Sequence, residues 1–242
     1  MKHFGKRGSQ VGIIISFNLF ILFLLSIFLL INPVLKERGE KQPVLYSLYQ
    51  NILENVSSNM TLTLIKIGAS YNSGGKTCLN FSEGGWDSGE DIVVKNITNE
   101  RISSNINYPE IEVNWEGENR FLKVYSSLEN FESMPLSPND CATPTENLDF
   151  FIKSIKTENY VFESNIAKLN TIYNNSYEDL KHYLDVPLEE EFGFSFINST
   201  GDTVIEVGRI PTSVSVYSKE NYVNYVDNQS NILPGVIIVK VW

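Results

Sequence analysis

The chain has 242 residues, a net charge of −10 and a hydrophobic content of 42%, values that fit a folded body and not a disordered one. The acidic balance argues against nucleic acid as a partner, because phosphate binding requires clustered lysine and arginine side chains. Tyrosine and phenylalanine are abundant, with 12 and 14 copies. This favours a sheet-rich core, since aromatic side chains pack well on pleated surfaces.

Residues 11–31 form an uncharged apolar run, VGIIISFNLFILFLLSIFLLI, which is long enough to cross a membrane as a helix. The tail before it is basic and contains no acid, whereas the cations after it are balanced by acids. This bias predicts a cytoplasmic leader (1–10), a membrane helix (11–32) and an extracellular body. A cleaved secretory signal is the alternative, but its apolar core would be shorter and a small-residue cleavage site would follow it.

The basic tail ends in Lys6-Arg7-Gly8-Ser9-Gln10, directly before the apolar run. This arrangement resembles the class III signal peptide of archaeal type IV pilin-like proteins. The resemblance implies cleavage by a membrane peptidase after Gly8 or Ser9, with the apolar helix kept as an anchor or filament core. Many pilins carry Glu at the fifth mature position, which is Ile13 or Ile14 here. The resemblance therefore points to a minor subunit or a simple anchored surface protein.

Residues 33–58 carry an apolar stripe at helical spacing. They predict a helical stalk, separated from the membrane helix by breaks at Pro33 and Pro43, which packs on the body. Residues 59–242 alternate between short apolar runs and turn residues. This pattern predicts a mainly β (α+β) extracellular domain, an antiparallel sandwich-like body with one or two short helices. The proline-containing stretch 133–147 predicts a loop that divides two subdomains.

Period-two alternation and turn residues locate the individual elements of the body. Strands are expected at 60–64, 78–81, 91–98, 110–115, 121–126, 149–156, 159–163, 192–197, 202–207, 213–217, 221–226 and 235–241. A helix is expected near 166–172. A second is expected over 177–184, where Ser176 begins a capping-box pattern. Residues 198–202 are typical of a hairpin turn.

Cys78 and Cys141 are the two cysteines of the chain. An extracellular location predicts that they form a disulfide, with two free buried thiols as the alternative. Neither cysteine has a second cysteine or a histidine close in sequence, which argues against a zinc site.

Seven Asn-x-Ser/Thr sequons are candidate N-glycosylation sites if the body lies outside the cell. They begin at Asn55, Asn59, Asn80, Asn96, Asn174, Asn198 and Asn228. Some of them arise by chance, because asparagine and serine are frequent in this chain. Asn198 is the strongest candidate, since the expected hairpin turn would expose it.

Three further motifs have ordinary interpretations. Gly74-Gly75-Lys76-Thr77 has the end of a phosphate-binding loop, but Ser70 stands where the pattern requires glycine, so we interpret it as a hairpin turn. The run 87–91 offers carboxylates of the kind that calcium prefers, without EF-hand spacing. We interpret it as a solvated loop, and 189–191, which is Glu-Glu-Glu, as an exposed turn.

Catalytic patterns are lacking in the sequence. His182 is the one histidine in the body, so a serine or cysteine nucleophile would lack its usual base. We therefore expect no enzyme, no cofactor and no metal. The sequence predicts a cell-surface structural or adhesive protein, type IV pilin-like or associated with the cell envelope. Its expected partners are membrane lipid, through 11–31, and other pilin-like subunits or envelope proteins.

Two other functions stay open on the sequence. The first is a membrane-anchored module that binds a ligand or a partner. It would show a concave pocket with aromatic walls, near Trp86 or Trp115. The second is an extracellular hydrolase with two facing carboxylates, but acidic residues are too common in this chain to single out a pair.

Overall fold

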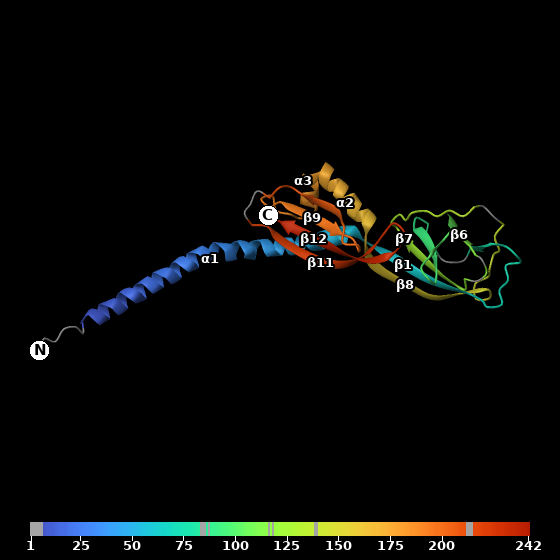
Figure 1. The fold of residues 1–242 in the computed structure, drawn as a ribbon. Helices are drawn as coiled ribbons and strands as arrows, with labels where there is room; N and C mark the ends of the chain where they lie inside the picture. Colours follow the sequence, from blue (N-terminus) through green and yellow to red (C-terminus); the bar gives the residue numbers. More distant parts are fainter. Residues whose placement is uncertain are drawn as a thin grey trace.

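The computed structural model describes residues 7–82, 86, 88–115, 117, 119–137, 140–211 and 215–242. Within the first helix, side chains are described for residues 12–30 and from Lys41 onward. A long helix leads into an elongated body of two lobes (Figure 1). The expected class is confirmed, because the chain is mainly β with an apolar N-terminal helix and a few short helices.

One helix, α1 (Arg7–Val56), runs without interruption from the basic tail to the first strand. The predicted breaks at Pro33 and Pro43 are wrong, because both prolines lie inside α1. An interior proline removes one hydrogen bond and costs about 3 kcal/mol, which commonly bends a helix instead of ending it. Here the apolar run favours helix on one side of the prolines, and packing on the body holds the helix on the other.

The two ends of α1 have opposite surroundings. The segment Gly12–Leu30 has a mean hydropathy of 2.9 and none of it is buried by the rest of the chain. By length and composition it is sufficient to cross a membrane. The C-terminal end is instead buried in the body along one face, through Leu45, Leu48, Tyr49, Ile52 and Val56. The prediction that the stalk packs on the body is thus confirmed.

Two sheets form the body. The nine-stranded sheet has the order β10-β9-β12-β11-β8-β1-β7-β3-β4. Its strands are β1 (Ser57–Ile67), β3 (Asp91–Asn96), β4 (Arg101–Ile102), β7 (Phe121–Ser127), β8 (Phe150–Phe162), β9 (Phe192–Ile197), β10 (Thr203–Gly208), β11 (Tyr217–Val226) and β12 (Ile232–Val241). The three-stranded sheet has the order β2-β6-β5, from β2 (Cys78–Phe81), β5 (Ser104–Asn107) and β6 (Glu110–Asn114). The pairs of both sheets are antiparallel except β8 with β11.

The proximal lobe lies beside the apolar helix and comprises β9 to β12, α2 (Glu163–Asn175), α3 (Tyr177–Tyr183) and the C-terminal end of α1 (Figure 1). Its core combines the buried face of α1 with aromatic side chains of β9, Phe192, Phe194 and Phe196. Helices thus cover one face of the sheet in this lobe, and the expected sandwich does not extend here.

The distal lobe lies at the far end of the body and comprises β2 to β7. Its core packs the small sheet against the large one, through residues such as Phe81, Ile111, Val94 and Val124. This lobe is the sandwich-like part of the body. The long strands β1 and β8 run through both lobes and pair along their whole length, from Ser57↔Val161 to Ile67↔Phe150.

The stretch 133–147 does not divide the two lobes, so that prediction is wrong. It runs along the distal lobe instead, where the Met134 carbonyl accepts a hydrogen bond from the Ser104 amide at 3.0 Å. Residues 138 and 139 lie outside the described residues. The boundary between lobes falls inside β1 and β8, which a local loop signal cannot reveal.

Most expected strands are present, and some are longer than predicted. The segments expected at 149–156 and 159–163 are one strand, β8, and the strand expected at 221–226 begins earlier, at Tyr217, in β11. Of the strand expected at 213–217, residues 213 and 214 lie outside the described residues, and residues 215 and 216 are not in a strand. Ser176 is the N-cap residue of α3 but makes no side-chain capping bond, so the capping box is not formed. The hairpin turn at 198–202 is confirmed by the bond from the Asn198 amide to the Asp202 carbonyl at 3.0 Å.

Candidate functional site

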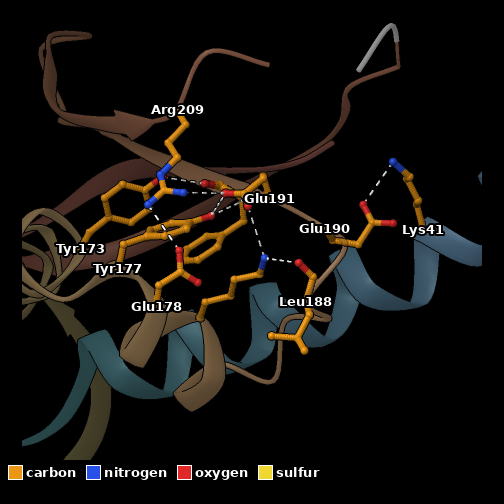
Figure 2. Close-up of polar contacts among 10 residues, drawn as sticks. Lys41, Tyr173, Tyr177, Glu178, Leu188, Glu190, Glu191 and Arg209 are labelled. Carbon is orange, nitrogen blue, oxygen red and sulfur yellow. Dashed lines mark hydrogen bonds and ion pairs between the residues drawn. The ribbon is translucent and has the colours of Figure 1, made fainter. Parts of the chain in front are cut away.

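Charged side chains connect α1 to the body at the point where α1 leaves it (Figure 2). Lys41 Nζ lies 3.1 Å from Glu190 Oε2, and these side chains are 13% and 15% exposed. Ten residues further on, Asn51 Nδ2 donates to the Leu184 carbonyl at the end of α3, at 2.8 Å. Two polar contacts therefore fix the direction of α1, in addition to its apolar face.

Beside Glu190, four side chains form a connected group that we call the junction cluster: Tyr177, Lys181, Glu191 and Arg209. Glu191 is its centre, because it accepts the Tyr177 hydroxyl bond at 2.5 Å and lies 3.3 Å from Lys181 Nζ and 3.6 Å from Arg209 Nη1. The prediction of an exposed turn at 189–191 is thus wrong for Glu190 and Glu191, whereas Glu189 is exposed.

Burial of Lys181 is the unusual feature of this cluster, since its side chain is only 3% exposed. A buried ammonium requires compensation by charge and hydrogen bonds. Lys181 Nζ obtains both, from Glu191 and from the Leu188 carbonyl at 2.8 Å. The lysine thereby fastens the 188–191 loop to α3.

Aromatic rings pack against the junction cluster. The Tyr177 ring stacks on Phe192 with centroids 5.4 Å apart, and the Arg209 guanidinium lies 3.9 Å above the Tyr177 ring centroid. Tyr173 packs edge-on against Tyr177, and its hydroxyl donates to the Phe192 carbonyl at 2.7 Å. The Tyr177 hydroxyl also accepts from the Phe192 amide at 3.2 Å. The cluster thus ties α2 and α3 to the start of β9.

The pKa shifts of Tyr177 and Glu191 keep the phenol neutral and the carboxyl ionised at neutral pH. Burial, and then the bond to Glu191, raise the pKa of Tyr177 well above its ordinary value. Partial burial alone would raise the pKa of Glu191, but the Tyr177 bond and the charges of Lys181 and Arg209 outweigh it, and that pKa is lowered. The arrangement therefore suits a permanent polar clamp between α1 and the body more than proton transfer.

The predicted disulfide is confirmed. Cys78 and Cys141 are bonded, with their Cα atoms 4.7 Å apart. The bond joins β2 to the 140–142 segment, where the Ala142 amide donates to the Cys78 carbonyl at 2.9 Å. The disulfide therefore links two segments of the distal lobe that are far apart in the sequence.

The sequons differ in exposure. Asn59, Asn174 and Asn228 are exposed, whereas Asn55, Asn80, Asn96 and Asn198 are half-buried. The expected exposure of Asn198 is therefore only partial, because its side chain folds back to accept from Thr200 and Asp202. Asn80 Nδ2 already donates to Glu110 at 2.8 Å, so a glycan there would break a bond. Asn59, Asn174 and Asn228 are therefore the accessible acceptors.

The other sequence candidates occupy varied positions. Lys6 lies outside the described residues, and Arg7, Gly8, Ser9 and Gln10 form the first turns of α1, with no side chain described. In the 87–91 run, Asp87 also lies outside them, and Asp91 accepts the Phe131 amide at 2.6 Å. Gly74 and Gly75 have φ of 67° and 86°, as expected for a turn.

His182 is exposed on α3. Among described residues, no group of three or more His, Cys, Asp or Glu side chains is placed to hold a metal ion.

A concave surface does exist near Trp115. Trp115, Tyr71 and Arg120 line a depression of about 410 Å³ in the distal lobe. The Arg120 guanidinium lies 5.8 Å from the Trp115 ring centroid, and Trp115 Nε1 donates to the Asn119 carbonyl at 2.8 Å. Trp86, the other candidate, is buried in the distal core.

Comparison of the chain with protein-family models, with curated proteins and with solved structures finds no match. The pilin-like resemblance of the leader therefore stays a prediction.

Proposed function

We propose that the protein is a membrane-anchored cell-surface subunit of the type IV pilin-like kind, with a structural or adhesive role and no catalysis. The observation that carries this proposal is the uninterrupted helix α1. Its first part is apolar and unburied over Gly12–Leu30, and its last part is built into the core of the body. An apolar surface of that size is unstable in water, so lipid or neighbouring helices surround it.

Two further features support a body outside the cell. The basic tail precedes the apolar segment without an acid, which favours a cytoplasmic N-terminus. The Cys78–Cys141 disulfide is typical of an oxidising compartment. The junction cluster fits the same role, because a body that transmits load to its anchor benefits from a rigid connection.

Processing of the leader tests the pilin-like part of the proposal. In cells of the native host, mass spectrometry of the mature protein should find an N-terminus at Ser9 or Gln10. The double variant Lys6→Ala/Arg7→Ala should keep Met1, because it removes the cations before the cleavage position. The matched control is Lys36→Ala/Arg38→Ala, which removes two cations on the other flank and should be processed normally. An intact Met1 terminus in the wild type would overturn this part.

Topology is tested separately. A protease added to whole cells should cleave the body after residue 40 and leave the apolar helix protected. The same treatment of cells that carry a reporter fused before Met1 should leave the reporter intact. A protected body together with a digested reporter would reverse the proposed orientation.

A second candidate function, an anchored ligand-binding module, is favoured by the depression at Trp115. Aromatic walls with a cation beside them suit a sugar ring that carries an acidic group. A panel of linear oligosaccharides titrated against the full chain in detergent micelles tests it. Binding that is lost in Arg120→Met but kept in Lys156→Met, a matched exposed cation, would support this function, and equal binding by both variants would contradict it.

A further inference from the structure

A pocket of about 300 Å³ lies between the two lobes, and we call it the interlobe pocket. On the distal side it is lined by Lys95 of β3, Tyr125 of β7 and Asn99. On the proximal side it is lined by residues 230–233, at the turn from β11 into β12. Ile232 and Leu233 supply apolar surface, and the other lining residues supply polar atoms.

Three cations share one register across the strands beside this pocket. Lys95 on β3 is directly opposite Lys123 on β7 and directly opposite Arg101 on β4. Like charges in directly opposite positions are destabilising, and this row occurs in a chain whose net charge is −10. Arg101 is offset by Glu132, with Nη1 3.6 Å from Oε2. Lys123 Nζ reaches neutral acceptors, the Ile97 carbonyl and Asn99 Oδ1.

Lys95 is the central member of the row and is almost completely buried, with 2% exposure. Its Nζ donates to Asn231 Oδ1 at 2.8 Å, the one hydrogen-bond acceptor that it reaches among the described residues. An ammonium has three donors, so one neutral acceptor and the Tyr125 ring, whose centroid lies 5.5 Å from Nζ, compensate its burial only in part. Burial lowers the pKa of Lys95, Asp227 opposes this, and Arg101 and Lys123 add to the lowering.

Asp227, the acid whose charge acts on Lys95, reaches it only through Asn231. Asp227 uses its carboxylate to cap its own turn, with Oδ1 accepting the amides of Gln229 and Asn231 at 2.9 and 2.8 Å. Its Oδ2 accepts Asn231 Nδ2 at 2.9 Å, so the Asn231 amide stands between the acid and the lysine. The pocket therefore retains positive charge.

Ser230 adds a second uncompensated group. It is 1% exposed, and its Oγ has no hydrogen-bond partner in the described part of the chain. Its φ of 61° lies in the left-handed region, which is strained for a residue with a side chain. A buried hydroxyl without a partner costs free energy, and a ligand oxygen in the pocket would satisfy it.

We propose that the interlobe pocket binds a small carboxylate ligand of the acidic-sugar class, held by Lys95 and Ser230. The ammonium and the hydroxyl donate to the ligand oxygens, and Tyr125, Ile232 and Leu233 pack against its carbon skeleton. The volume limits the ligand to about one sugar ring. This inference goes beyond the proposed function, because it concerns the body and does not depend on the anchor or its processing.

Isothermal titration of the full chain in detergent micelles tests the proposal, with sodium glucuronate as the probe. Glucose is the matched neutral ligand, and sodium sulfate is the matched inorganic anion. Glucuronate should bind, and glucose should bind at least about tenfold more weakly, because it lacks the charge that Lys95 recognises. Sulfate should compete weakly, since it lacks the apolar skeleton.

Variants locate the binding. Lys95→Met keeps the apolar stem and should weaken glucuronate binding by about tenfold or more, whereas Ser230→Ala should weaken it only a few-fold. Lys156→Met, on the exposed part of β8, is the matched control and should bind as the wild type does. If Lys95→Met does not fold, Ser230→Ala decides alone. Equal binding of glucuronate and glucose, binding of sulfate alone, or wild-type affinity in Ser230→Ala would each overturn the proposal.

Discussion

The two lobes reach stability by different means, although they share the strands β1 and β8. The proximal lobe encloses a large aromatic core and receives one full face of α1. The distal lobe has a smaller core between two sheets and carries the Cys78–Cys141 disulfide. Small domains bury little apolar surface and are only marginally stable, so many of them are stabilised further by a disulfide. The proximal lobe therefore depends on its helix for stability, and the distal lobe depends on its disulfide.

Loss of the disulfide should give the largest effect and should be confined to the distal lobe. The variant Cys78→Ser/Cys141→Ser frees a loop with a sequence separation of 63 residues. The loop-entropy model then predicts a loss of about 4 kcal/mol in the free energy of unfolding. Hydrogen exchange followed by mass spectrometry should show faster exchange in β2 and β6, with β9 and β12 unchanged.

The same variant decides whether the lobes are separate cooperative units. If exchange rises equally in both lobes, β1 and β8 couple them into one unit and the proposed contrast is wrong. The reduced wild-type protein is the matched control, because it lacks the bond but keeps both sulfur atoms, and it should resemble the double variant.

Truncation of the α1 face should reverse this pattern. Leu48 is 1% exposed in the proximal core, so Leu48→Ala should cost about 3 kcal/mol by lost burial and a residual cavity. Exchange should rise in β11 and β12, against which α1 packs, and stay unchanged in β2 and β6. Glu54→Ala, on an exposed position of the same helix, is the control and should change stability by less than about 0.5 kcal/mol. Increased exchange in the distal lobe would contradict the contrast.

Features that depend on local sequence patterns could be predicted, whereas features that depend on contacts between distant residues could not. Strands such as 78–81 and 192–197 match the structure because their alternation is local and turn residues bound them. The continuity of α1 could not be predicted, since proline is a local signal and the packing that holds Leu45 to Val56 is not. The boundary between the lobes, inside β1 and β8, could not be predicted either, because pairing between distant strands leaves no local sequence pattern.

The junction cluster and the interlobe pocket could not be predicted from local sequence patterns either. Glu191 belongs to a run of three acids that is typical of a solvated turn, and its cationic partner Arg209 is distant in sequence. Lys95 in a strand is ordinarily exposed, but the turn that carries Ser230 and Asn231 covers it. A weak signal existed in Lys181, which falls on the same helical face as Tyr177 and Leu180 and would have to be buried with them. Only the cysteines could be assigned with their role, the disulfide that the structure contains.

A smaller effect is expected from the hydroxyl of Tyr177. Tyr177→Phe keeps the stacked ring but removes the donor to Glu191 and the acceptor of the Phe192 amide. The buried amide is then unsatisfied, so the proximal lobe should lose about 1–3 kcal/mol, measured by urea unfolding in micelles. Tyr183→Phe is the matched control, because Tyr183 is 66% exposed, and it should be neutral. A neutral Tyr177→Phe would mean that the ring alone holds the cluster.

The smallest effect is a dependence on pH that belongs to the proximal lobe alone. The folded-state pKa of Glu191 lies below its ordinary value of 4.5, so the ionised carboxylate stabilises the folded state. That stabilisation is complete above the ordinary value and is lost as the pH falls through the lower, folded-state value. Wild type should therefore exceed Glu191→Gln in the free energy of unfolding at pH 7, and the difference should shrink below about pH 4.5.

Subtracting the variant from the wild type at each pH removes the titration of other carboxylates, including Glu129, whose pKa is also lowered. Glu189→Gln, an exposed neighbour, should show no such difference at any pH. A difference for Glu191→Gln that is constant from pH 7 to pH 3 would mean that the charge of Glu191 contributes nothing. The clamp would then rest on ring packing and on the Lys41–Glu190 pair, and α1 would be held by its apolar face much as the distal lobe is held by its disulfide.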